Sequence, residues 1–377
     1  MIPAETLPGE RRVAALPDVV GQLSAAGLQV RVQAGAGEHA LASDEAYAEA
    51  GAEVVETVEA AKVDVLLHVR PLRSGTIAKL RPGAITIGFC SPSTELDGVR
   101  ALRDGRITAF AMELVPRISR AQSMDALTSQ ALIAGYRCVL EAAMRLPRFF
   151  PLFMTAAGTV PPAKVLVLGA GVAGLQAIAT AKRLGAVVSG YDVRAASADE
   201  VRSMGGTFVH LDLESREGAG GYAREMTQDR AQRQRDLLAP FIAAADVLIT
   251  TAAVPGRPAP LLVTREMVTG MGPGSVIVDL AAESGGNVEG ARPGEEILID
   301  RDGGAVRLLG MKDAPSTMPV DASRLYAKNV ANLLMLMTKD GEVVPDFDDE
   351  VVAGTCLTHD GVVRHEPTAA LLEDGDR

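Results

Sequence analysis

The segment KVLVLGAGVAGLQAIATAKRLGAVVSGYD, residues 164–192, constrains the fold of this chain more than any other part of it. An apolar run ends in Gly169-x-Gly171-x-x-Gly174, an apolar helical pattern follows, and a second apolar run ends in Asp192. The first glycine permits a tight turn, the second lets a phosphate approach the backbone, and the third lets the helix pack closely on the strand. This order predicts a β-α-β unit that binds a dinucleotide pyrophosphate at the N-terminus of the helix.

The acidic residue at the end of the second run bears on which dinucleotide is bound. Asp192 lies 18 residues beyond Gly174, near the offset expected for a carboxylate that binds the adenosine ribose hydroxyls. A carboxylate would repel the 2′-phosphate of NADP by about 4 kcal/mol at 4 Å and an effective dielectric of 20. The sequence therefore favours NAD(H), although Arg194 leaves NADP(H) open because a guanidinium can accept that phosphate.

Short β-branched apolar runs alternate with helical patterns along most of the chain, which is typical of α/β domains with parallel sheets. The expected strands are residues 28–33, 63–69, 84–90 and 107–115 in the N-terminal portion, and 164–169, 187–192, 207–212, 246–250 and 275–280 in the second. The predicted fold class is α/β, with two Rossmann-like doubly wound domains that are joined by two long helices across a cleft.

Two long helical patterns set the expected domain boundaries. One begins after residue 126, and the other, DASRLYAKNVANLLMLMT, covers residues 321–338. We therefore expect a discontinuous first domain, residues 1–126 plus 320–377, and an NAD(H)-binding domain at residues 127–319.

Composition excludes several classes of function. The net charge of −11 argues against a nucleic-acid-binding surface. No run approaches the ~20 apolar residues that span a bilayer, so we expect no direct insertion into a membrane. Three widely spaced cysteines and five scattered histidines have no metal-ligand spacing, so no metal site is expected.

The stretch PRISRAQSMDALTSQA, residues 116–131, is rich in hydrogen-bonding groups and runs into the first long helical pattern. Its side chains include Arg117, Gln122 and Asp125, a set that can position a polar ligand. A simpler interpretation is a helix N-terminus with solvated charges, in which Ser119 or Ser123 is the cap.

Several segments together resemble the α subunit of the proton-translocating NAD(P) transhydrogenases, in particular its separate NAD(H)-binding domain. The resemblance covers nearly all of the chain up to about residue 340. It is carried by VPRISRAQSMDALTSQALIAGYR, TAAGTVPPAKVLVLGAGVAGLQA, GGYAREM, TTAAVPGRPAPLLVTREMV and SVIVDLAAESGGN. Alanine dehydrogenases are similar over the same span but less closely.

The resemblance implies direct hydride transfer between NADH on this chain and NADP+ on the NADP-binding domain of a partner β subunit. A membrane-spanning domain would couple that exchange to proton translocation. The family also implies a homodimer at the cytoplasmic side of the inner membrane, peripheral to it through its partner subunits.

The resemblance also implies roles for individual residues. Arg117 and Asp125 would orient the nicotinamide carboxamide and its ribose, and Gln122 would reach toward the second nucleotide. The other implied contacts to the nucleotide are Ile118, Ser119, Val172, Asp192, Val193, Arg194, Gly221 and Tyr222, together with the three glycines of the turn. Gly221 and Tyr222 belong to the glycine-rich stretch ESREGAGGYAREMTQD, for which the residues alone predict flexibility.

Two alternative functions stay open at this point. An enzyme of the alanine dehydrogenase type would carry a histidine after the strand that matches AITIGF, where this chain has CSPS. That family's substrate lysine has no clear counterpart, since LLHVRP offers His68 and Arg70, and its aspartate corresponds to Glu283. The other alternative is a non-catalytic module that senses NAD(H) and regulates a partner.

Overall fold

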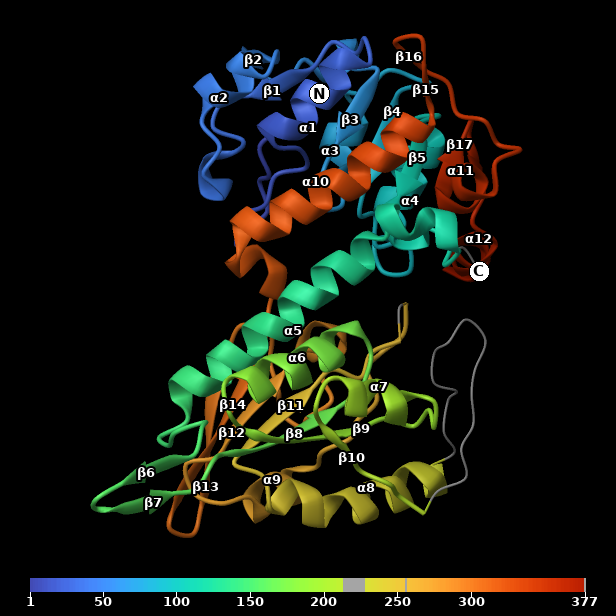
Figure 1. Ribbon diagram of the computed structural model, residues 1–377. Coiled ribbons are helices and arrows are strands. Elements are labelled where there is room, and N and C mark those ends of the chain that lie inside the picture. Colours follow the sequence, from blue (N-terminus) through green and yellow to red (C-terminus); the bar gives the residue numbers. More distant parts are fainter. Residues whose placement is uncertain (213–227, 255, 376–377) are drawn as a thin grey trace. The chain divides into compact units, whose positions relative to one another are not determined.

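The computed structural model describes residues 1–212, 228–254 and 256–375 (Figure 1). The chain divides into two compact units: unit 1 is residues 1–130 with 315–377, and unit 2 is residues 131–314. Both predicted long helices are present, as α5 (Ala126–Arg145) and α10 (Pro319–Leu336). The chain enters unit 2 within α5 and returns to unit 1 just before α10.

Unit 2 is built on a seven-stranded sheet with the order β10-β9-β8-β11-β12-β14-β13. Its strands are β8 (Lys164–Leu168), β9 (Val187–Tyr191), β10 (Thr207–Phe208), β11 (Val247–Thr250), β12 (Val276–Asp279), β13 (Glu296–Arg301) and β14 (Gly304–Gly310). All neighbouring strands are parallel except β13 and β14. The five strands predicted for this unit are all present, whereas β13 and β14 were not predicted.

Helices cover both faces of this sheet, which explains its continuous apolar strands. The helices of unit 2 besides the end of α5 are α6 (Val172–Arg183), α7 (Ser197–Ser203), α8 (Gln228–Ala243) and α9 (Arg265–Gly270). Val165 and Val167 of β8 pack in a cluster with α5 and α6. Leu166 and Leu168 pack in a cluster with α8 and α9. These two helices lie on the face of the sheet opposite to α5 and α6 (Figure 1).

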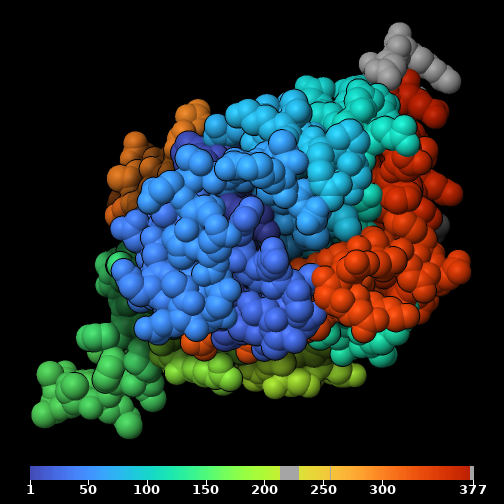
Figure 2. Space-filling model, turned by 90° about the horizontal axis from the view of Figure 1, so that it is seen from above, coloured from blue at the N-terminus to red at the C-terminus, as the bar shows by residue number. Residues whose placement is uncertain are grey.

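A hairpin of unit 2 stands apart from the seven-stranded sheet. It consists of β6 (Phe153–Thr155) and β7 (Gly158–Val160), and every residue of both strands is exposed. In the space-filling view it projects from the surface in green (Figure 2). The hairpin was not predicted from the sequence.

Unit 1 contains a five-stranded sheet with the order β18-β17-β5-β4-β3. Its strands are β3 (Val65–Leu67), β4 (Ile85–Gly88), β5 (Thr108–Ala111), β17 (Cys356–His359) and β18 (Val362–Val363). Strands β3, β4 and β5 are parallel, and β17 from the end of the chain pairs antiparallel with β5. Small separate pairs are formed by β1 (Arg31–Gln33) with β2 (Glu53–Val55) and by β15 (Thr338–Lys339) with β16 (Glu342–Val343).

The helices of unit 1 also lie on both faces of their sheet. They are α1 (Pro17–Ala25), α2 (Asp44–Glu49), α3 (Ser74–Ile77), α4 (Leu96–Asp104), α10, α11 (Glu350–Thr355) and α12 (Glu366–Gly375). Helices α1 and α10 share one apolar cluster with the sheet, and α3, α4 and α12 share another. Two α/β units with mainly parallel sheets confirm the predicted fold class.

One glycine of α5 permits the packing of α5 on α6, and this generates a prediction. A Cβ on Gly135 would lie 2.1 Å from the carbonyl oxygen of Ala173, which is backbone and cannot yield as a flexible side chain would. Gly135→Ala should therefore lower the free energy of unfolding by about 1–3 kcal/mol in urea denaturation.

The matched control is Gly21→Ala in α1, where the nearest atom to the new Cβ is Ala50 O at 4.0 Å. That change should be neutral or stabilising by up to about 1 kcal/mol, because alanine has the higher helix propensity. Equal losses of stability in the two variants would show that the α5–α6 contact is not tight.

Candidate functional site

The turn between β8 and α6 can be formed only by glycine at two of its three glycine positions. Gly169 has a φ of +99°, and a Cβ there would lie 2.7 Å from Thr251 Oγ1. A Cβ on Gly174 would lie 1.8 Å from the carbonyl oxygen of Gly169. The first turn of α6 therefore packs directly against the end of β8, as the sequence predicts.

The third glycine leaves the N-terminus of α6 open. Gly171 is the N-cap residue, it is exposed, and a Cβ there would meet nothing within 4 Å. Within the described residues no side chain caps the helix, and Val172 of its first turn is 38% exposed. The free N–H groups and the positive end of the helix dipole make this turn suited to bind an anion such as a pyrophosphate.

Asp192 follows β9 and is tied both to the glycine turn and to Arg194. Its Oδ2 accepts from the backbone N–H of Ala170 at 2.8 Å. Its Oδ1 accepts from the backbone N–H of Arg194 and from Arg194 Nε, both at 2.9 Å, and Arg194 Nη2 donates to Oδ2 at 3.1 Å. The Asp192 carboxylate is thus paired with the Arg194 guanidinium, and the Asp192 side chain is only 9% exposed.

This pairing changes the electrostatic expectation from the sequence. The negative charge of Asp192 is largely compensated by the guanidinium of Arg194, so it repels a 2′-phosphate less than an isolated carboxylate would. The four hydrogen bonds also occupy the lone-pair directions of the carboxylate. A ribose hydroxyl that bound to Asp192 would have to replace one of the bonds from Arg194.

Three polar residues that were not assigned from the sequence support the same turn. Thr251, directly after β11, donates its hydroxyl to the Gly169 carbonyl at 3.0 Å. The buried amide of Asn287 accepts from Ala252 N at 3.0 Å and donates to Ala252 O at 2.8 Å. Asp279, at the end of β12, accepts from Asn287 N at 2.8 Å. Their signal in the sequence is a polar side chain at or shortly after the carboxyl end of an apolar strand.

Burial and hydrogen bonding act in opposite directions on that aspartate. Burial raises the pKa of Asp279 above its usual value, and the bonds from Val288 N, Thr250 Oγ1, Ala281 N and Asn287 N oppose the rise. Through these bonds Asp279, at the end of β12, connects Thr250 at the end of β11 to the backbone of residues 281–288.

The predicted polar loop, residues 117–125, belongs to unit 1 and contains the 3-10 helix Ser119–Met124. Such a helix has three residues per turn, so every third side chain lies on the same face. Ile118, Ala121 and Met124 pack into the core of unit 1. Ser119 and Gln122, one position further along, are not part of that core, and Gln122 and Arg117 are exposed. Arg117, Ser119 and Gln122 are therefore exposed beside an apolar base, whereas Asp125 is half-buried.

Asp125 caps the helix that follows the loop. Its Oδ1 accepts from Thr128 N at 2.8 Å and its Oδ2 accepts from Thr128 Oγ1 at 2.7 Å. This is the geometry of an N-cap on the first turn of α5. The prediction that Ser119 or Ser123 is the N-cap residue was wrong. Asp125, directly before α5, accepts from the backbone N–H of Thr128 in the first turn instead.

The predicted site residues thus form two groups. Arg117, Ile118, Ser119, Gln122 and Asp125 are together in unit 1. The glycine turn with Val172, Asp192, Val193 and Arg194 is in unit 2, where Val193 packs against the apolar cluster of α8 and α9. The predicted contacts at Gly221 and Tyr222 lie outside the described residues.

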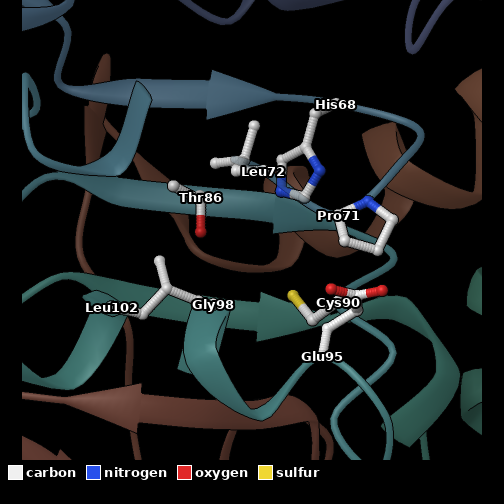
Figure 3. Close-up of a pocket in the computed structure, with 8 residues that line it drawn as sticks. All are labelled: His68, Pro71, Leu72, Thr86, Cys90, Glu95, Gly98 and Leu102. Carbon is white, nitrogen blue, oxygen red and sulfur yellow. The ribbon is translucent and has the colours of Figure 1, made fainter. Parts of the chain in front are cut away.

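A small cavity in unit 1 lies at the ends of β3 and β4 (Figure 3). Its space suffices for about one water molecule. His68 Nε2 and Thr86 Oγ1 are buried there without a hydrogen-bond partner among the described residues. The lining residues are His68, Pro71, Leu72, Thr86, Cys90, Glu95, Gly98 and Leu102.

His68 is held neutral at this cavity. Its Nδ1 is 2.8 Å from the carbonyl oxygen of Arg70, to which it donates, and burial lowers the pKa of His68 to about 4. The backbone carbonyl of His68 accepts from the Tyr326 hydroxyl at 2.8 Å. These contacts favour a structural role for His68.

Two further properties concern the described residues alone. None of their helices is both long and apolar enough to cross a membrane. No group of three or more histidine, cysteine, aspartate or glutamate side chains there could hold a metal ion.

Comparison with known proteins covers both units. The alanine dehydrogenase/PNT N-terminal domain matches residues 1–134, and the alanine dehydrogenase/PNT C-terminal domain matches residues 138–366. An NAD(P) transhydrogenase subunit alpha polypeptide of Rhodospirillum rubrum is 48% identical over 376 residues, which cover 97% of each chain. Alanine dehydrogenase of Mycobacterium tuberculosis is 33% identical over 78% of this chain and 74% of its own.

A solved structure of high similarity agrees with these matches. The transhydrogenase from Sinorhizobium meliloti superimposes with a TM-score of 0.84 at 44% identity, covering 97% of this chain and 98% of that one.

The pairing of Asp192 with Arg194 generates a prediction about nucleotide choice. In Arg194→Ala the carboxylate loses its compensating charge, so the 2′-phosphate of NADPH is repelled more strongly while NADH is not. The ratio of the NADPH and NADH dissociation constants should rise about tenfold, which corresponds to about 1.4 kcal/mol. Calorimetric titration with each nucleotide measures it.

Arg202→Ala is the matched control, because Arg202 pairs with Asp199 on the exposed surface of α7. It should leave the ratio unchanged. An unchanged ratio in Arg194→Ala as well would mean that the guanidinium does not compensate Asp192 when nucleotide binds.

The buried histidine generates a prediction about pH. Between about pH 6.5 and pH 4 the unfolded chain takes up a proton that folded His68 does not. Stability should therefore fall as the pH is lowered through this window, by an amount on the order of 3 kcal/mol from this group. The free energy of unfolding in urea, measured at a series of pH values, should depend less on pH in His68→Gln than in the unchanged chain. The same pH dependence in both would show that the pKa of His68 is not lowered by burial.

Proposed function

The chain belongs to the alanine dehydrogenase/PNT family, and from this membership we propose that it is the NAD(H)-binding catalytic component of a proton-translocating transhydrogenase. It exchanges hydride directly between NAD(H) on this chain and NADP(H) on a partner subunit. The observation that carries the proposal is the 48% identity over 97% of the chain to a transhydrogenase α subunit, against 33% over 78% to an alanine dehydrogenase.

The glycine turn of unit 2 fits a dinucleotide. The pyrophosphate binds at the uncapped N-terminus of α6, where Gly171 leaves open space and Val172 is exposed. Asp192, Val193 and Arg194 hold the adenosine end, at the carboxyl end of the neighbouring strand β9. The bound nucleotide supplies a nicotinamide ring that gives or accepts the hydride.

Loop 117–125 of unit 1 holds the nicotinamide end. Hydride transfer requires two ring carbons within ~3–3.5 Å, so the protein contributes orientation and exclusion of water rather than a general acid or base. Arg117 and Asp125 orient the carboxamide and its ribose, with Ile118 and Ser119 beside them. Gln122 reaches toward the nucleotide of the partner. The apolar base of the loop, the exposure of Arg117 and Gln122 and the fixed direction of the Asp125 carboxylate support these roles.

The partners follow from the same proposal. They are a β subunit with an NADP-binding domain and a membrane-spanning subunit, which couples hydride transfer to proton translocation. The chain acts as a homodimer on the cytoplasmic side of the inner membrane, to which its partner subunits hold it. Gly221 and Tyr222, outside the described residues, contribute to binding of the nucleotide.

The similarity to alanine dehydrogenases makes a self-contained dehydrogenase the second candidate. The residues after β4 include Cys90-Ser91-Pro92, which offer no imidazole for acid–base chemistry, and His68 is buried with its Nδ1 bound to the carbonyl oxygen of Arg70. A chain of that type would reduce NAD+ with L-alanine, whereas a transhydrogenase component or an NAD(H) sensor would not.

The proposal is tested by mixing the chain with an isolated NADP-binding domain of a transhydrogenase. NADH, an NAD analogue with shifted absorbance and catalytic NADP(H) are supplied, and reduction of the analogue is followed. Rapid reduction that requires both proteins is expected. No reduction with an active NADP-binding domain and intact NADH binding would reject hydride exchange and favour a sensor, or a dehydrogenase if L-alanine is oxidised.

The position proposed for Gln122 generates a prediction. Gln122→Asn shortens the side chain by one methylene group without changing its chemistry. Turnover in the same mixture should fall by about 10²-fold, because a displacement on the order of 1 Å at the reacting centre can have that effect.

NADH affinity of Gln122→Asn should stay within a few-fold of the unchanged chain, since the residue faces the other nucleotide. Gln232→Asn, in the exposed part of α8, is the control for the same change elsewhere. Strong loss of NADH binding with normal turnover would rule out the position between the two nucleotides.

A further inference from the structure

We infer that Asn329, Asn332 and Asp349 are positioning residues for loop 117–125: they bind Arg120 and Ser123 and so fix the position of Gln122, which lies on another face of the same 3-10 helix. The effect on turnover rests on the proposed function, but the effect on the loop does not. All the residues concerned belong to unit 1.

The period of the 3-10 helix separates the loop into three faces. Ile118, Ala121 and Met124 form the face that packs into the core, and Ser119 and Gln122 lie on a second face that is directed away from it. The third face contains Arg120 and Ser123. Each of these two residues is held by a segment that follows more than 200 positions later in the chain.

Two amides of α10 bind the carbonyl oxygen of Ser123. Asn329 Nδ2 donates to it at 2.8 Å and Asn332 Nδ2 at 3.0 Å. Asn329 is itself oriented, because its Oδ1 accepts from Ser129 Oγ at 2.7 Å and the residue is only 7% exposed. The end of a short helix leaves carbonyl groups without helical partners, and α10 supplies partners for this one.

Asp349 binds the guanidinium of Arg120 with both oxygens. Arg120 Nη1 donates to Oδ2 at 2.9 Å and Nη2 donates to Oδ1 at 2.7 Å, and Nε donates to Glu350 at 3.3 Å. Asp349 Oδ1 is also the N-cap of α11, accepting from Val351 N at 2.8 Å and Val352 N at 3.3 Å.

The capping bonds make Asp349 an immobile partner, unlike the aspartate of an ordinary surface ion pair. An exposed pair usually contributes little because two flexible side chains must be ordered. Here the carboxylate is ordered by α11 already, and a bidentate bond fixes the direction of the guanidinium as well as its distance.

None of these three residues binds the face of the loop that carries Gln122. They therefore determine where Gln122 lies, and they do not themselves contact the nucleotide. The core face resists movement into or out of the unit, while the amides and the ion pair resist rotation of the 3-10 helix about its axis. Rotation would move the side chain of Gln122 sideways, and hydride transfer is sensitive to displacements on the order of 1 Å.

Two substitutions weaken the anchors without touching the face that carries Gln122. Asp349→Asn keeps the N-cap of α11, since asparagine caps as well as aspartate, but removes the charge that binds Arg120. Asn332→Ala removes one of the two amide donors to Ser123 at an exposed position. The control is Asp360→Asn, which removes the same charge from the exposed Arg106–Asp360 pair, where the positive φ of 45° also suits asparagine.

The first measurement is amide hydrogen exchange of the peptide that contains residues 117–125, in the free chain without partner. Exchange there should be about tenfold faster in Asp349→Asn and in Asn332→Ala, because local opening becomes easier, and unchanged in Asp360→Asn. Unchanged exchange in both test variants would overturn the inference, whatever the chain catalyses.

The second measurement is turnover with the NADP-binding domain. For the two test variants kcat should fall about fivefold to tenfold, with the NADH dissociation constant within twofold and kcat of Asp360→Asn unaffected. Normal kcat despite faster exchange, or a parallel loss of NADH binding and stability, would overturn the positioning role. If the unchanged chain gives no turnover, the proposed function fails, and the exchange measurement alone decides the inference.

Discussion

The contact between the first turn of α6 and the end of β8 is the constraint on which unit 2 depends. At Gly174 a single added carbon would lie 1.8 Å from the Gly169 carbonyl, so the helix can start here only because both positions lack side chains. This close packing of α6 on β8 places the free N–H groups of α6 at the carboxyl edge of the sheet. Thr251 and Asp192 then bind the same turn from the two neighbouring strands.

Local patterns made most of the parallel sheets and the glycine turn predictable, because central strands such as β8, β11 and β12 are continuous apolar runs that are buried on both faces. The antiparallel additions were missed for a physical reason. Strands β13 and β14 carry exposed residues among their buried ones, and β17 joins a sheet whose parallel strands lie more than 240 residues earlier. The polar character of loop 117–125 was predicted, whereas Asn329, Asn332 and Asp349 share no local pattern with the loop that they hold.

Electrostatic compensation differs from what the sequence alone indicates. Asp192 was expected to bind the adenosine ribose and Arg194 was left as a possible partner of a 2′-phosphate, but Arg194 folds back onto Asp192 and onto the carbonyl oxygen of Ala170 at 3.2 Å. Any selectivity for NAD(H) would then depend on how this pair rearranges when a ribose hydroxyl competes for the carboxylate. Asp125, similarly, is already bound to Thr128, so a nucleotide contact there would use a carboxylate that is already fixed in direction.

We propose that hydride passes directly from the nucleotide on this chain to the one on its partner. The most direct test uses NADH that carries deuterium at the transferred position of C4, mixed with this chain, NADP+ and the partner NADP-binding domain. We expect NADPH that retains the deuterium in full, because a directly transferred hydride does not exchange with solvent. Loss of the deuterium to water, or NADPH formation that does not need this chain, would contradict it.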